Sequence, residues 1–155
     1  MSQELQQQFS QTAPRIVERA AAALPQTAQT AYFTITGRVF ITQLIGEVTT
    51  VVQSQATTLQ WVINPTVGAD VTMTSAGLDA NAHAVGTLYG VTGTFASQID
   101  FRASGGLQPG EQMASPGTLV SAGTIDLKTV ASSTGATKWT VHYVPLDGGS
   151  SISPA

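Results

Sequence analysis

The clearest evidence for the fold of this chain lies in residues 32–54, YFTITGRVFITQLIGEVTTVVQS. It holds two runs rich in Thr and β-branched residues, and in the first run Phe33 and Ile35 alternate with Thr34 and Thr36. A period of two is typical of a strand with one buried face, and these residue types fit a pleated, half-buried surface. The segment therefore predicts β-strands.

Similar runs follow along the rest of the chain. They lie at residues 59–63, 71–74, 88–91, 95–101, 118–120, 123–130 and 138–144. Short strands about 8–12 residues apart, joined by Gly, Pro, Asn and Ser turns, indicate an antiparallel sandwich or barrel. No alternation of strands with helices supports a parallel sheet. We predict an all-β fold, an antiparallel β-sandwich that is jelly-roll-like in size.

The two ends of the chain differ in composition from its centre. Residues 1–29 are rich in Gln, Ala, Glu and Arg, which form helices well. Pro14 suits the first turn of a helix and Pro25 a position beyond its end. We therefore expect a short amphipathic helical arm, which packs on its own domain, docks on a neighbouring subunit or stays partly disordered. Removal of residues 1–25 should leave a folded β-domain but weaken its assembly. The division predicted is an arm and linker (1–29), a β-sandwich domain (30–146) and a flexible polar tail (147–155).

Composition limits the partners that this chain can bind. Only 10% of its 155 residues are charged, against about 25% in typical domains, so Thr, Ser, Gln, Ala and Gly must cover the surface. The net charge is −3, and the six Lys and Arg residues are scattered, whereas a nucleic-acid surface needs clustered cations. No run is apolar for the ~20 residues of a membrane span, and no signal peptide is evident. The expected partners are proteins, with no nucleic acid and no membrane.

Candidate metal ligands are few. The chain has no cysteine, which excludes disulfides, thiolate zinc sites and a Cys nucleophile. Asp79, Asn81 and His83 stand at alternate positions, as ligands of a calcium loop do, but the Gly and bidentate Glu of such a loop do not follow. A turn in which Asp and Asn bind local backbone N–H groups explains the same residues better. His142 is expected on the polar face of the last strand.

No catalytic constellation is evident. Ser121 lacks the surroundings of a nucleophile elbow. The nine acidic residues lie singly, which favours solvated side chains, although a glycosidase pair stays open. We therefore expect a non-enzymatic protein with no catalytic residue, no cofactor and no metal.

Aromatic side chains allow two interpretations. They could form a sugar-binding platform beside the surface loop or lid at residues 103–115, or they could fill the core, which is commoner for aromatics on alternating strands. The residues concerned are Tyr32, Trp61, Tyr89, Trp139 and Tyr143. We predict that they form the core.

Two stretches resemble virion proteins of tailed bacteriophages: ITGRVFITQLIGEVTTV, residues 35–51, and GTIDLKTVASSTGATKWTVHYVPL, residues 123–146. The resemblance extends over about residues 30–150. It lies in the general character of the sequence and includes no diagnostic motif. It implies a structural subunit present in many copies, made in the host cytoplasm and incorporated into the virion.

Within that class the resemblance implies a head decoration or cement protein. Such a protein would form a trimer on the outer head surface and bind the major capsid protein lattice, with its terminal arm reaching the capsid or a neighbour. The alternatives are a tail, baseplate or fibre component, a carbohydrate-binding β-sandwich that exposes Trp61 or Trp139, and a virion-borne glycan hydrolase.

Overall fold

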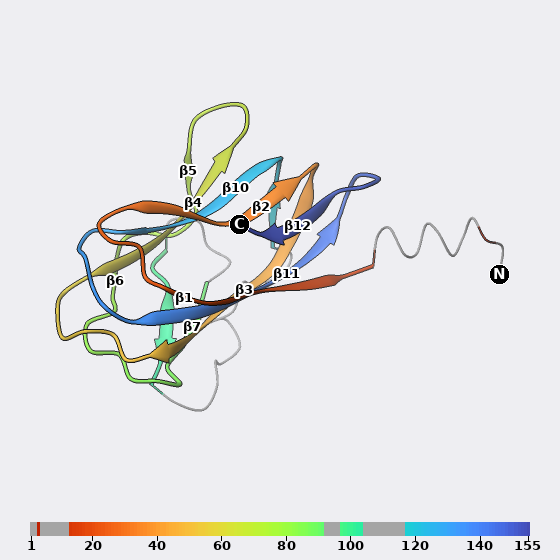
Figure 1. Ribbon diagram of the computed structural model, residues 1–155. Coiled ribbons are helices and arrows are strands. Elements are labelled where there is room, and N and C mark those ends of the chain that lie inside the picture. Colours follow the sequence, from red (N-terminus) through yellow and green to blue (C-terminus); the bar gives the residue numbers. More distant parts are fainter. Residues whose placement is uncertain (1–2, 4–12, 92–96, 104–116) are drawn as a thin grey trace.

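The computed structural model describes residue 3 and residues 13–91, 97–103 and 117–155. In this part of the chain the strands form two antiparallel sheets in a sandwich-like arrangement (Figure 1). The first sheet has the order β1 (Arg15–Ala23), β11 (Ala136–Pro145), β3 (Val39–Thr50), β7 (Leu88–Gly90) and β8 (Asp100–Arg102), and β9 (Thr118–Val120) also pairs with β3. The second has the order β12 (Ser151–Pro154), β2 (Gln29–Thr36), β10 (Gly123–Thr129), β4 (Thr58–Pro65) and β5 (Val71–Thr72), and β6 (Leu78–Asp79) also pairs with β4. The predicted all-β, antiparallel class is confirmed.

Aromatic rings join the two sheets in one core. Trp61 of β4 and Trp139 of β11 meet edge to face, with ring centroids 4.7 Å apart. Tyr32 packs edge-on against Trp61, and Tyr89 stacks on Trp139. These four side chains and Tyr143 are at most 2% exposed. The predicted aromatic core is confirmed, and the alternative of an exposed Trp61 or Trp139 platform is wrong.

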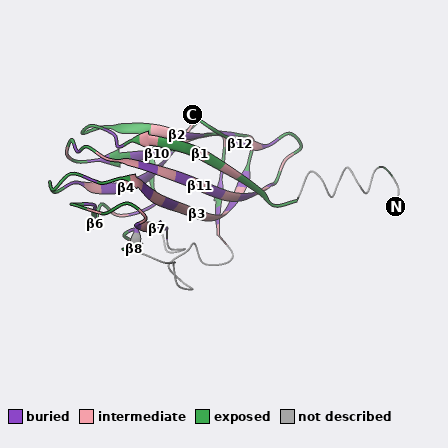
Figure 2. Ribbon diagram, turned by 60° about the horizontal axis from the view of Figure 1, so that its bottom comes forward, coloured by how far each residue is buried: buried purple, intermediate pink, exposed green. Residues whose placement is uncertain are grey.

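Alternation along the central strands explains why the core forms. Buried residues alternate with more exposed ones along β11 and through most of β3, as Figure 2 shows. Gly46 fits this pattern for a steric reason, because a Cβ at this position would lie 2.7 Å from the ring of Trp139. The indole therefore fills the space that a side chain on β3 would need.

The predicted helix between Pro14 and Pro25 is wrong, because residues Arg15–Ala23 form the edge strand β1. β1 pairs with β11 along its length, with a bulge between Arg19 and Ala22. Val17 packs against the core, and the guanidinium of Arg19 lies 4.0 Å from the centroid of the Tyr32 ring. Tertiary pairing thus overrides the helix propensity of the alanines. Of the predicted arm, residues 1–2 and 4–12 lie outside the described residues.

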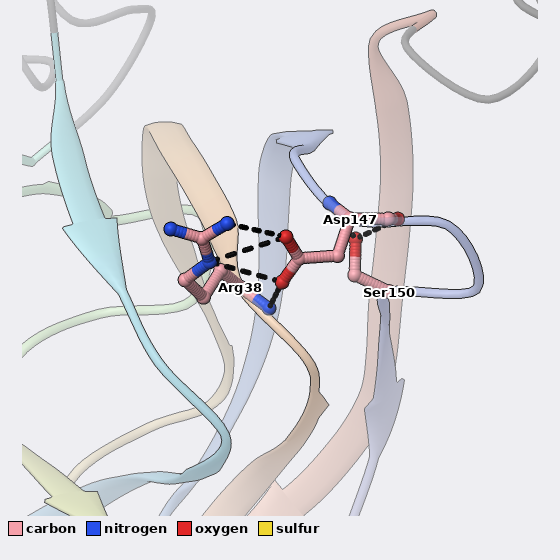
Figure 3. Close-up of polar contacts among 3 residues, drawn as sticks. All are labelled: Arg38, Asp147 and Ser150. Carbon is pink, nitrogen blue, oxygen red and sulfur yellow. Dashed lines mark hydrogen bonds and ion pairs between the residues drawn. The ribbon is translucent and has the colours of Figure 1, made fainter.

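The predicted flexible tail is also wrong, because β12 continues the second sheet beside β2. Ile152 faces the core and is 4% exposed. Figure 3 shows how the preceding turn is held: the Asp147 carboxylate accepts hydrogen bonds from the Arg38 backbone N–H at 3.0 Å and from its guanidinium, the shortest at 2.6 Å. Ser150 Oγ donates to the Asp147 carbonyl oxygen at 2.9 Å. β1 and β12 therefore belong to the same two sheets as the strands described between residues 30 and 146.

Other differences concern the predicted run 95–101 and the loop 103–115. β8 begins only at Asp100, and residues 92–96 lie outside the described residues. Of the loop, only Ala103 is described. Within the described ranges, no helix is both long and apolar enough to cross a membrane.

Candidate functional site

The Asp79–His83 segment is a turn whose polar groups bind the backbone. Asp79 Oδ1 accepts hydrogen bonds from the backbone N–H of Thr57 at 3.0 Å and of Asn81 at 3.1 Å. This is the geometry that the turn interpretation predicts. Across residues 13–91, 97–103 and 117–155, no group of three or more His, Cys, Asp or Glu side chains could hold a metal ion.

His83 belongs to an aromatic cluster with Tyr89 and Phe101. Its Nδ1 lies 2.9 Å from the Tyr89 hydroxyl, and its ring stacks on Phe101 with centroids 4.5 Å apart. Burial lowers the pKa of His83, partly opposed by the negative charge of Asp79, and burial raises the pKa of Tyr89. Both groups are therefore neutral at pH 7, and their hydrogen bond joins a neutral imidazole to a neutral phenol. The cluster links the turn at residues 79–83 to β7 and β8.

His142 and Ser121 lie apart from this cluster. His142 occupies β11 between Ile16 of β1 and Gln43 of β3, on the outer face of the first sheet. Ser121 is exposed in the turn between β9 and β10. The structure thus does not bring the sequence-predicted polar candidates together.

The outer face of the first sheet carries an apolar stripe, which we define as Ile16, Phe40, Leu119 and Val144. Phe40 of β3 lies directly opposite Val144 of β11 and Leu119 of β9. Residues directly opposite in antiparallel strands place their side chains on the same face. Leu119 is 59% exposed and Ile16 is 65% exposed, while Phe40 and Val144 are half-buried. Leu119, Phe40 and Val144 therefore adjoin across three strands, while Ile16 lies opposite His142, two residues from Val144 along β11. Exposed apolar side chains that adjoin in this way mark contact sites.

Charges on the same face pair among themselves. Lys138 of β11 lies 3.3 Å from Glu47 of β3 and 3.8 Å from Glu18 of β1. Exposed ion pairs of this kind contribute little stability. Lys138 stands near the start of β11 and Val144 near its end, so these charges lie away from the apolar stripe.

The second sheet brings together polar side chains that sequence reasoning missed. Gln29, Asn64, Asp70 and Asp126 are joined by hydrogen bonds between their side chains. These residues are far apart in the chain, and only the strand order places them together. No short motif could have indicated the group.

Comparison with protein-family models, with curated proteins and with solved structures gave no match.

Proposed function

We propose that this chain is a non-enzymatic structural subunit of a tailed-bacteriophage virion, and most simply a head decoration protein that stabilises the capsid. Its partners in this proposal are copies of itself, as a trimer, and the major capsid protein lattice at the outer head surface. The observation that carries the proposal is the apolar stripe, which gives the outer face of the first sheet a surface suited to protein contact.

The strand order supports a finer proposal, that the sandwich is a jelly roll. Pairing is nested: β1 pairs with β11, β2 with β10, β3 with β7, and β4 with β5. Nested antiparallel pairs are what a long hairpin produces when it rolls up into two sheets. Jelly rolls occur in viral capsid and lectin domains, so this topology is compatible with a virion subunit.

Weak, repeated contacts provide the physical mechanism. Each copy would bind through a small apolar surface, and the low share of charged residues, 10% of the chain, keeps repulsion between adjoining copies small. A subunit that touches several neighbours gains from effective concentration, because each contact holds the others in place. Since the subunit binds the assembled lattice and not free capsid protein, it stabilises the shell by mass action.

Location on the particle tests the proposal. Antibodies raised against the purified chain are applied to phage particles from cells that carry its gene, and gold labels are counted by electron microscopy. Labels over the heads are expected. Labels confined to tails would support the rival tail, baseplate or fibre function, and particles without label would contradict a virion protein of either kind.

A further inference from the structure

On the outer face of the second sheet, one neutral amide joins two carboxylates. Gln29 Nε2 donates a hydrogen bond to Asp126 Oδ2 at 2.9 Å and another to Asp70 Oδ2 at 3.0 Å. Asn64 Nδ2 also approaches Asp126 Oδ2, at 3.3 Å. The carboxylates come from β10 and from the segment between β4 and β5, so the fold holds two negative charges close together.

The Asp126 carboxylate has an unsatisfied oxygen. Asp126 is only 4% exposed, and its Oδ1 is buried without a hydrogen-bond partner among the described residues. In that part of the chain, neither Asp126 nor Asp70 has a Lys or Arg nitrogen within 4.0 Å. A buried charged oxygen that lacks a partner is unfavourable. This atom therefore indicates a ligand that brings positive charge.

We propose that Asp126, Asp70, Asn64 and Gln29 form a binding site for Ca²⁺. The two carboxylates provide the negative charge, and Asp126 can bind with both oxygens. Rotation of the two amide groups by 180° replaces their nitrogens with oxygens, and neither amide oxygen has a hydrogen-bond partner in the described part of the chain. Carboxylate and amide oxygens, completed by water, are the ligands that Ca²⁺ takes.

The chemistry of the group favours Ca²⁺ over other divalent cations. Zn²⁺ prefers His and Cys ligands, and this group has neither. Mg²⁺ requires near-octahedral geometry and keeps several waters, whereas Ca²⁺ accepts six to eight oxygens in irregular arrangements. Four side chains from three strands and a connecting segment suit the larger cation.

Binding at this site would be structural. Ca²⁺ would tie Asp70, which is exposed, to β2 and β10 through Gln29 and Asp126. The site lies on the opposite outer face from the apolar stripe, so loss of Ca²⁺ binding would leave the proposed contact between copies intact. Two carboxylates on a partly exposed site suggest an affinity of about 10⁻⁴–10⁻³ M, as in extracellular calcium modules.

Calorimetric titration and thermal unfolding of the full chain, first treated with EDTA, test the site. Addition of Ca²⁺ should release or absorb heat with saturation, and about 10 mM Ca²⁺ should raise Tm by several degrees. The same concentration of Mg²⁺ should have a clearly smaller effect. Asp70→Asn and Asp126→Asn should each abolish both responses to Ca²⁺.

Glu47→Gln is the matched control, because it makes the same change of carboxylate to amide on the other sheet and should keep the full response. If the Asp126→Asn variant does not fold, the Asp70→Asn variant alone tests the Ca²⁺ site, since an exposed side chain can be changed without loss of packing. No saturable heat and no rise in Tm in the unmodified chain would overturn the proposal. An equal response in Asp70→Asn and in the unmodified chain would also overturn it, as the mark of a general salt effect.

Discussion

At the scale of single residues, the His83 cluster shows how packing sets the charge of a side chain. The imidazole stacks on Phe101 and shares a hydrogen bond with Tyr89, so protonation would place a charge in partly desolvated surroundings. Burial therefore lowers the pKa of His83 in the folded chain, whereas the unfolded chain keeps an ordinary value of about 6.5.

This difference predicts a pH-dependent stability. Above about pH 7.5, one unit above the unfolded pKa, His83 is neutral in both states and has no effect. As pH falls below that value the unfolded chain takes up the proton first, so the free energy of unfolding decreases until the lower folded pKa is passed. Urea unfolding between about pH 7.5 and 5 should show this decrease, and His83→Gln should reduce it. His142→Gln, on the outer face of the first sheet, is the control and should leave the His83 contribution intact.

Gly46 gives a second prediction at this scale. A methyl group at this position would overlap the Trp139 ring in the core, and overpacking of this kind costs about 1–3 kcal/mol. Gly46→Ala should lower the free energy of unfolding by that amount and shift the tryptophan fluorescence. At Gly148 a Cβ would meet no atom within 4 Å, so Gly148→Ala is the control and should change stability by less than about 0.5 kcal/mol. Equal stability of the Gly46→Ala and Gly148→Ala variants would contradict the packing described.

At the scale of elements, the interior strands were predictable and the terminal ones were not. β2, β3, β4, β10 and β11 have the buried alternation or the β-branched content that marks a strand. The sequence of β1 predicts a helix because four of its nine residues are consecutive alanines. Its extended conformation depends on pairing with β11. β12 was not predicted as a strand because Gly, Ser and Pro around it prefer loops. Its pairing with β2 and the burial of Ile152 overcome that preference.

The position of β1 changes what truncation should do. Removal of residues 1–25 takes away the strand that pairs with β11 and the buried side chain of Leu24, so the truncated chain should lose several kcal/mol of stability or fail to fold. Removal of residues 1–12, which include none of the described strands, is the control. Circular dichroism and urea unfolding measure both. A truncation at residue 25 as stable as the control would show that β1 adds nothing to the fold, contrary to this structure.

The polar group on the second sheet was beyond sequence analysis for a related reason. Gln29 is 41 residues from Asp70 and 97 residues from Asp126, and their proximity depends on the order β2, β10, β4. The alternation of each strand indicates which residues face outward, but it does not give the order of the strands. The apolar stripe could not be predicted for the same reason, since its residues lie on β1, β3, β9 and β11 and the sequence does not give the order of these strands.

At the scale of the whole molecule, the chain combines a well-packed aromatic core with a surface that has little charge. Its exposed apolar side chains include the ends of the stripe, Ile16 and Leu119, as well as Val67 in the segment after β4. Exposed apolar residues that stand singly are common on soluble proteins. The stripe differs because Leu119, Phe40 and Val144 lie directly opposite one another across three strands. We therefore expect the stripe, and not Val67, to mediate self-association.

The mass of the full chain in solution, measured by light scattering, tests this claim most directly. We predict a mass about three times the 16.0 kDa of one chain, because the proposed trimer would bury the stripe. Leu119→Glu should lower the mass toward that of one chain, because it places a charge in the contact. Val67→Glu, at a residue 88% exposed outside the stripe, should leave the mass unchanged. A mass of one chain for the unmodified protein, unaltered by Leu119→Glu, would contradict the account.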